Sequence, residues 1–142
     1  MLIAGLLAIV SASPALAARQ PLPPELDGLW RVADSACAGC DPSQGAETGA
    51  ELRLAARGTR NPFGTDCDGA LEVEAQADEP LAVVQERLGL PPRWLAGAGT
   101  APARAWRLWC EGRPTETVIL LANGALLLPG EASSVLHFQR VR

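Results

Sequence analysis

The stretch Leu26–Cys40, LDGLWRVADSACAGC, determines how this chain is expected to fold. Near its start, Trp30 and Val32 alternate with Leu29 and Arg31, which is the two-residue period of a β-strand. The pattern predicts a strand over 28–34 whose tryptophan is buried in a core. The stretch ends with two of the chain's four cysteines, so the same segment also bears on crosslinking.

Residues 1–17 are predicted to be a secretory signal peptide rather than part of the folded domain. Leu2–Val10 is an apolar run, and Ala15–Ala17 has the small-x-small form that signal peptidase cleaves. No Lys or Arg precedes the run, and it is shorter than the ~20 residues that span a bilayer. We expect residues 18–25 to be an extended, proline-rich lead-in and residues 26–142 to be a single β-rich domain.

The cysteines at 37, 40, 67 and 110 are interpreted as two structural disulfides. An even number of cysteines in an exported chain favours disulfides. The favoured pairing is Cys37–Cys40 with Cys67–Cys110, and the rival joins Cys37 or Cys40 to Cys67. A CxxC pair is also compatible with redox or metal chemistry, but Asp41-Pro42 favours a loop over the helix start that a redox cysteine uses.

Turn residues divide the remaining chain into about seven strands and one helix. Asn123-Gly124 predicts a hairpin with a type I′ turn. The fold class is therefore mostly β, a small antiparallel barrel or sandwich stapled by disulfides. The strands are expected at 28–34, 51–57, 70–76, 104–111, 116–122, 125–128 and 134–141.

The helix is expected over Asp78–Gly89, with Asp78 as its cap and Gly89 at its end. Leu81, Val84 and Leu88 form one apolar stripe along it. Such a stripe needs a sheet to cover.

Charge argues against two classes of partner. The net charge is −4, and the basic residues are spread along the chain without a basic block. We therefore expect neither nucleic acid nor, after signal cleavage, a membrane as partner. No cofactor or metal is expected, and the protein is expected to be a monomer.

No motif in the sequence predicts catalysis. A nucleophile turn of the GxSxG type and a zinc-binding HExxH are both missing. His137, the single histidine, is expected to be exposed. Asp66 and Asp68 are interpreted as a solvated turn rather than a calcium loop, and Glu72 and Glu74 as the solvated face of a strand.

Three aromatic residues are candidates for contact with a partner: Trp94, Trp109 and Phe63. Tryptophan is frequent at contact sites because it offers a large area at a small entropic cost. Trp30 and Trp106 are assigned to the core. The alternative for Trp109 is that it packs beneath the helix stripe.

Gly28-Leu29-Trp30, on the first strand of a small exported β domain, resembles the GxW signature of lipocalin-like barrels. It also resembles the opening of the bacterial periplasmic inhibitors of secreted metalloproteases. The resemblance implies that Arg140, on the last strand, lies across Trp30. The chain also departs from the lipocalin pattern. Arg31 stands where lipocalins usually have an aromatic residue, and the helix is expected mid-sequence, whereas lipocalins have a helix before their last strand. In the inhibitors the amino-terminal segment enters the protease cleft, and 18–24 matches it by position.

These features predict an exported, non-enzymatic binding module, periplasmic or secreted, with inhibition of a hydrolase or protease as one form of its function. Its partner would be an exported enzyme or another protein. The first alternative is a lipocalin-like barrel that carries a small ligand, which requires an internal cavity. The second alternative is a redox or metal-binding protein that uses Cys37 and Cys40.

Overall fold

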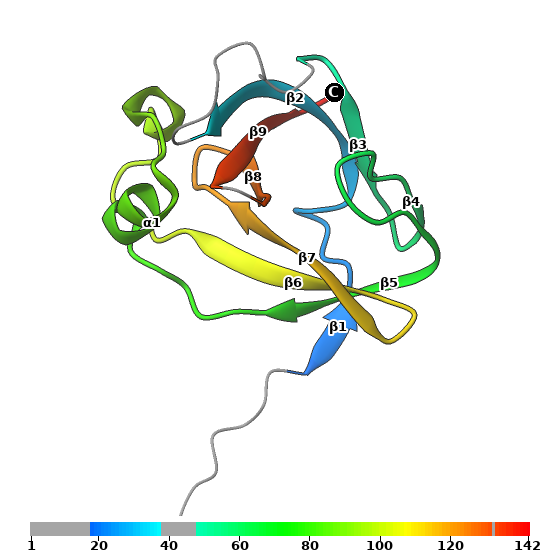
Figure 1. The fold of residues 1–142 in the computed structure, drawn as a ribbon. Helices are drawn as coiled ribbons and strands as arrows, with labels where there is room; N and C mark the ends of the chain where they lie inside the picture. Colours follow the sequence, from blue (N-terminus) through cyan, green and yellow to red (C-terminus); the bar gives the residue numbers. More distant parts are fainter. Residues whose placement is uncertain (1–17, 38–47, 132) are drawn as a thin grey trace, which may run out of the picture.

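The computed structural model describes residues 18–37, 48–131 and 133–142, which form a curled antiparallel sheet with two helical segments outside it (Figure 1). The predicted signal peptide and Cys40 lie outside these ranges. The described elements are β1 (Arg19–Pro21), β2 (Gly28–Cys37), β3 (Glu51–Leu54), β4 (Arg57–Thr59), β5 (Cys67–Ala75), α1 (Leu81–Leu88), the 3₁₀ helix η2 (Pro92–Leu95), β6 (Arg104–Cys110), β7 (Arg113–Leu120), β8 (Leu126–Pro129) and β9 (Ser134–Arg140).

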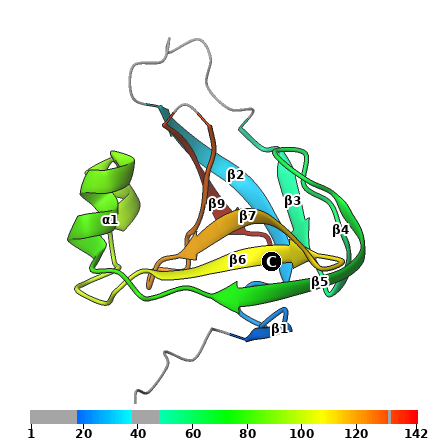
Figure 2. The ribbon, with the colours of Figure 1, turned by 60° about the horizontal axis from the view of Figure 1, so that its bottom comes forward.

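The sheet curls like a half-barrel, and the curling brings β3, at one end of the strand order, beside β4, which pairs with β5 near the other end. Neighbouring strands follow the order β1-β5-β6-β7-β8-β9-β2-β3, and β4 pairs with β5. One bridge links the two sides, because Arg53 and Arg60 exchange two backbone hydrogen bonds of 2.9 Å. Figures 1 and 2 show the resulting ring of strands from two directions.

The predicted fold class is confirmed, and the seven predicted strands all occur. Among the described residues there are two additional strands, β1 and β4, each of three residues, which is too short for alternation to reveal. The expected strand 51–57 is divided, because Thr59 folds back on Ala55. The Thr59 hydroxyl donates to the Ala55 carbonyl at 2.9 Å and accepts from the Ala55 amide at 3.1 Å.

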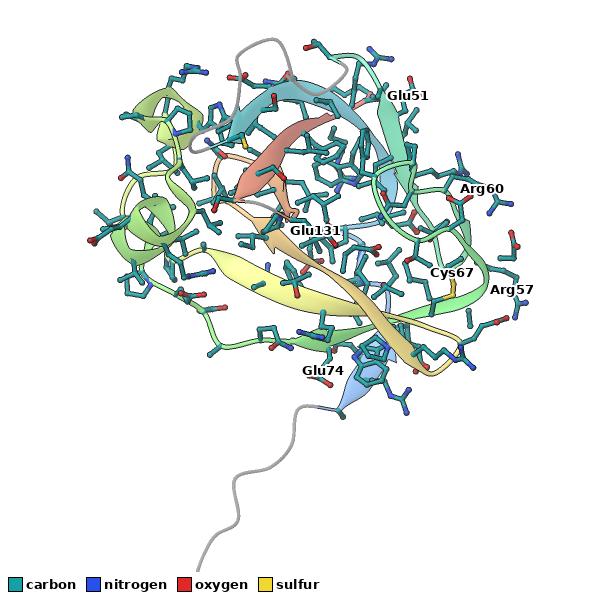
Figure 3. All side chains as sticks on the ribbon, viewed as in Figure 1. Glu51, Arg57, Arg60, Cys67, Glu74 and Glu131 are labelled. Carbon is teal, nitrogen blue, oxygen red and sulfur yellow. A yellow bond between two sulfur atoms is a disulfide. The ribbon has the colours of Figure 1, made fainter. Side chains whose placement is uncertain are left out.

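The inner face of the sheet encloses one apolar cluster (Figure 3). Trp30 is 1% exposed in this cluster, Trp106 is 3% exposed and Phe138 is fully buried. The burial of both predicted core tryptophans is thereby confirmed. The buried members are Leu26, Trp30, Val32, Leu52, Leu54, Cys67, Leu71, Val73, Trp106, Leu108, Val118, Leu126, Leu128 and Phe138.

The outer face carries a second cluster, which α1 and η2 cover (Figure 1). The predicted stripe faces it, with Val84 buried and Leu81 and Leu88 packed beside it. None of the helices among the described residues is long and apolar enough to cross a bilayer.

The predicted cap of α1 is wrong, whereas its end is confirmed. The helix begins at Leu81, after Pro80, because Glu79 is extended and exchanges backbone hydrogen bonds with Ala103 at 2.9 and 3.1 Å. Gly89 ends the helix in the left-handed conformation with φ of 64°, which glycine adopts without strain.

One disulfide links the start of β5 to the end of β6. Cys67 and Cys110 are bonded, with Cα atoms 5.8 Å apart, which confirms this half of the favoured pairing and contradicts the rival that joins Cys67 to Cys37 or Cys40. Figure 3 places Cys67 near Arg57 and Arg60 of the adjoining hairpin. Cys37 is disulfide-bonded as well, and Cys40, the partner expected for it, lies outside the described residues.

Candidate functional site

A β-bulge at Ala33 shapes the outer face of the β2–β9 pair. Val32 lies opposite Phe138, whereas Asp34 lies opposite His137, so Ala33 is an extra residue on β2. Strict alternation would turn Asp34 inward with Val32. The bulge instead places Asp34 on the outer face beside His137, which is how bulges redirect side chains.

Asp34 is held there by four donors. Its Oδ2 accepts from Arg93 Nη2 at 2.6 Å, from Arg93 Nε at 3.2 Å and from Trp94 Nε1 at 2.8 Å. Its Oδ1 accepts from the Ser35 amide at 2.8 Å. Burial acts to raise the pKa of Asp34, but the hydrogen bonds from Trp94, Arg93 and Ser35 outweigh burial and hold the pKa below its ordinary value.

His137 is buried, so its predicted exposure is wrong. It is 9% exposed because Trp94 of η2 stacks on its ring, with centroids 4.8 Å apart and planes 20° apart. Its Nδ1 has no hydrogen-bond partner among the described residues. Burial lowers the pKa of His137; the Asp34 charge opposes that shift, and the Arg93 charge adds to it.

Stability is therefore expected to fall as the pH drops from neutral toward 5. The His137 pKa is lowered in the folded state, so the unfolded chain binds this proton first as the pH passes below about 6.5. Urea unfolding at several pH values should show a smaller fall for His137→Phe, which keeps the stacked ring. Parallel pH profiles for the two proteins would contradict this assignment. Asp34 adds its own loss only in more acidic solution, because its pKa is also lowered.

Asn123 fastens η2 to the sheet. Its Nδ2 donates to the Trp94 carbonyl at 3.0 Å and to the Ala96 carbonyl at 2.9 Å. The predicted hairpin at Asn123-Gly124 is confirmed. The predicted type I′ turn is wrong, because that type needs a positive φ at both residues, and of the two only Gly124 has one, of 88°. The sequence suggested a turn residue here and gave no signal of this second role.

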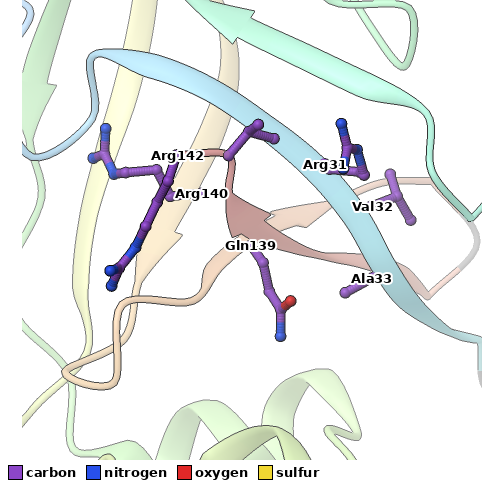
Figure 4. Close-up of a pocket in the computed structure, with 7 residues that line it drawn as sticks. Arg31, Val32, Ala33, Gln139, Arg140 and Arg142 are labelled. Atoms are coloured by element: carbon purple, nitrogen blue, oxygen red, sulfur yellow. The ribbon is translucent and has the colours of Figure 1, made fainter.

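A pocket of about 350 Å³ opens on the same β2–β9 pair (Figure 4). Two of its residues, Arg31 and Gln139, lie opposite each other two register steps from Asp34 and His137. The seven lining residues include three arginines and no acid. They are Arg31, Val32, Ala33, Gln139, Arg140, Val141 and Arg142.

Arg140 connects this pocket to the core. Its guanidinium carbon lies 4.4 Å from the Trp30 ring centroid, which confirms the position implied by the lipocalin resemblance. The same guanidinium donates to the carbonyls of Glu25 and Asp27. Trp30 Nε1 donates to the Leu26 carbonyl at 3.0 Å. The turn before β2 is thereby held against the end of the barrel.

Gly28→Ala is expected to destabilise the protein by about 1–3 kcal/mol. A Cβ at Gly28 would lie 2.7 Å from Arg140 Nη1, and the residue has a φ of +143°. Chemical denaturation measures the loss. Gly99→Ala is the control, because its φ is also positive but its Cβ would meet nothing within 4 Å. A Gly28→Ala loss no larger than that of the control would show that the Arg140 approach does not constrain this position.

The three aromatic residues predicted to contact a partner lie in separate surroundings. Trp94 is 3% exposed and packs in the outer cluster. Phe63 makes an edge-to-face contact with Phe138, with centroids 5.5 Å apart. Trp109 is half-buried, and the Arg19 guanidinium lies 4.8 Å from its ring centroid. The alternative position of Trp109 beneath the helix stripe is wrong, because the residues around α1 do not include it.

The acidic pairs fill structural or solvated positions. Asp66 accepts from the Asn61 amide at 2.7 Å, and Asp68 forms an exposed ion pair with Arg60 at 2.8 Å. Glu72 and Glu74 alternate with the buried side chains of β5, as expected for its outer face.

Comparison with known proteins identifies no relative: no family model, no curated protein and no solved structure matches this chain. The chemistry of the two faces of the sheet is therefore the basis on which a function is proposed.

Proposed function

We propose that this protein is an exported, non-enzymatic binding module that meets a partner protein through its outer surface. Inhibition of an exported hydrolase or protease is the form of this function that its resemblance to lipocalin-like periplasmic inhibitors favours. The observation that carries the proposal is the packed inner face of the sheet. Because large side chains occupy the interior, recognition is assigned to the outside.

The size and burial of the interior side chains support this assignment. Trp30, Trp106 and Phe138 are each at most 3% exposed and belong to one cluster. Carriage of a ligand in the lipocalin manner needs an apolar cavity at this place. The pocket on β2 and β9 instead opens at the surface and combines arginine and glutamine side chains with apolar ones, a mixture that suits a protein partner.

The disulfide supports export. Cys67 and Cys110 are bonded through a linkage that is stable in oxidising compartments and rare in the cytosol. Together with the predicted signal peptide, this favours the periplasm or the exterior of the cell. A crosslinked barrel also presents its surface residues on a rigid support, which reduces the entropy lost on binding.

The lead-in is the alternative contact surface, because the corresponding segment of the inhibitors enters a protease cleft. Here Arg19–Pro21 is an exposed strand whose residues pair with Glu72–Glu74 of β5. Its insertion into a cleft would require these pairings to separate. The β2–β9 face needs no such rearrangement, and we therefore assign the contact to it.

The proposal is tested by affinity capture from the exported fraction of the native host. The immobilised, oxidised protein is expected to retain a specific exported protein, and reduced, unfolded protein serves as the control. Lysozymes and secreted proteases are assayed in parallel for inhibition by the soluble domain. Capture of no protein, together with no inhibition, would contradict the proposal.

A further inference from the structure

We infer that the pocket between β2 and β9 binds an acidic segment of the partner protein, through carboxylates that meet Arg31, Arg142 and the exposed edge of Arg140. This inference rests on the proposed function and specifies the chemistry of the partner. It starts from the lining of the pocket, in which the charged side chains are all cationic.

The three guanidiniums differ in how far their existing contacts leave them available to bind a carboxylate. Arg142 makes no ion pair with any described residue. Arg31 is paired with Glu51 at 3.0 Å, but both side chains are about half exposed, and an exposed pair of this kind exchanges readily for another carboxylate. Arg140 is fixed by the Glu25 and Asp27 carbonyls and by Trp30. Its charge is therefore preorganised beside the pocket.

The positions of the arginines favour an extended ligand over a single small ion. Figure 4 shows Arg140 and Arg142 on one side of the group and Arg31 on the other, with Gln139 between them. A guanidinium accepts a carboxylate through two parallel hydrogen bonds, so each separated arginine can hold its own carboxylate. A segment with several Asp or Glu side chains meets this requirement.

Neighbouring residues limit how the segment can lie. Two register steps from the Arg31–Gln139 pair, Arg93 already donates to Asp34, and η2 covers His137. Although the Arg93 side chain is 67% exposed, its charge is balanced by Asp34, whose carboxylate would repel an acidic segment. The acidic segment is thus expected to lie at the other end of the β2–β9 pair, between Arg142 and Arg31.

Titration calorimetry with an acetylated oligoglutamate peptide at low ionic strength tests the inference. The oxidised protein is expected to bind the peptide, and added salt is expected to weaken binding. Arg31→Ala and Arg142→Ala should each weaken binding by about 5-fold. The double variant should weaken binding by about 25-fold, because the two sites are separate. Arg113→Ala, an exposed arginine outside the pocket, is the matched control and should bind as the unaltered protein does.

Three results would overturn the inference: no binding of the peptide, an equal loss in Arg113→Ala, or binding of inorganic phosphate as tight as that of the peptide. The last result would indicate a small-oxyanion site. If affinity capture still returns a partner that the Arg31→Ala/Arg142→Ala variant retains equally well, the pocket inference fails while the proposed function stands. Circular dichroism of each variant verifies that it is folded.

Discussion

Trp30→Ala is expected to lower the free energy of unfolding by about 3–5 kcal/mol, the range for removal of a large aromatic side chain from a packed core. The ring is 1% exposed and belongs to the inner cluster. Its loss also leaves the Arg140 guanidinium without its stacking partner and the Leu26 carbonyl without its donor. Urea denaturation followed by circular dichroism measures the change.

Two companion variants keep this prediction testable if Trp30→Ala fails to fold. Trp30→Phe retains most of the packing and is expected to lose less than the alanine variant. Trp109→Ala removes a half-buried tryptophan from the outer face, where it contacts Arg19, and is expected to lose about 1 kcal/mol. Equal losses for Trp30→Ala and Trp109→Ala would contradict the assignment of Trp30 to the packed core.

Removal of the disulfide, by Cys67→Ala with Cys110→Ala, is expected to cost about 4 kcal/mol, because the bridge spans 43 positions and restricts the unfolded chain. Thermal and chemical unfolding of the double variant, compared with the oxidised protein, gives the loss. Cys37→Ala with Cys40→Ala is the comparison, with about 2 kcal/mol expected for a shorter loop. A larger loss of unfolding free energy in this second variant than in the first would contradict the prediction that the bridge closing the longer loop stabilises more.

Local patterns in the sequence predict seven of the nine described strands, whereas the Cys67–Cys110 bond was only the favoured one among the possible cysteine pairings. Alternation around Trp30 reports directly on which side chains the sheet buries, and each of the seven predicted strands contains such a pattern or a short apolar run. The Trp30–Arg140 contact was implied by the family resemblance, since the two residues are far apart in the chain and no local pattern links them.

The group formed by Asp34, His137 and Trp94 on the outer face could not be predicted, because it depends on contacts between distant segments. The bulge at Ala33 is defined only by the pairing of β2 with β9, and it reverses the side on which Asp34 lies. The burial of His137 depends on η2, which the Asn123 side chain holds in place. Neither periodicity nor turn chemistry carries information about such contacts.

The central claim is that the inner face of the sheet is packed and that recognition takes place outside it. Its most direct test is a titration with neutral apolar ligands, such as a long-chain alcohol and a retinoid, followed by NMR of the indole N–H signals of Trp30 and Trp106. The account predicts that neither signal shifts and that no saturable binding occurs. Saturable binding of one ligand per chain, with both signals shifted, would show an internal binding site and contradict the account.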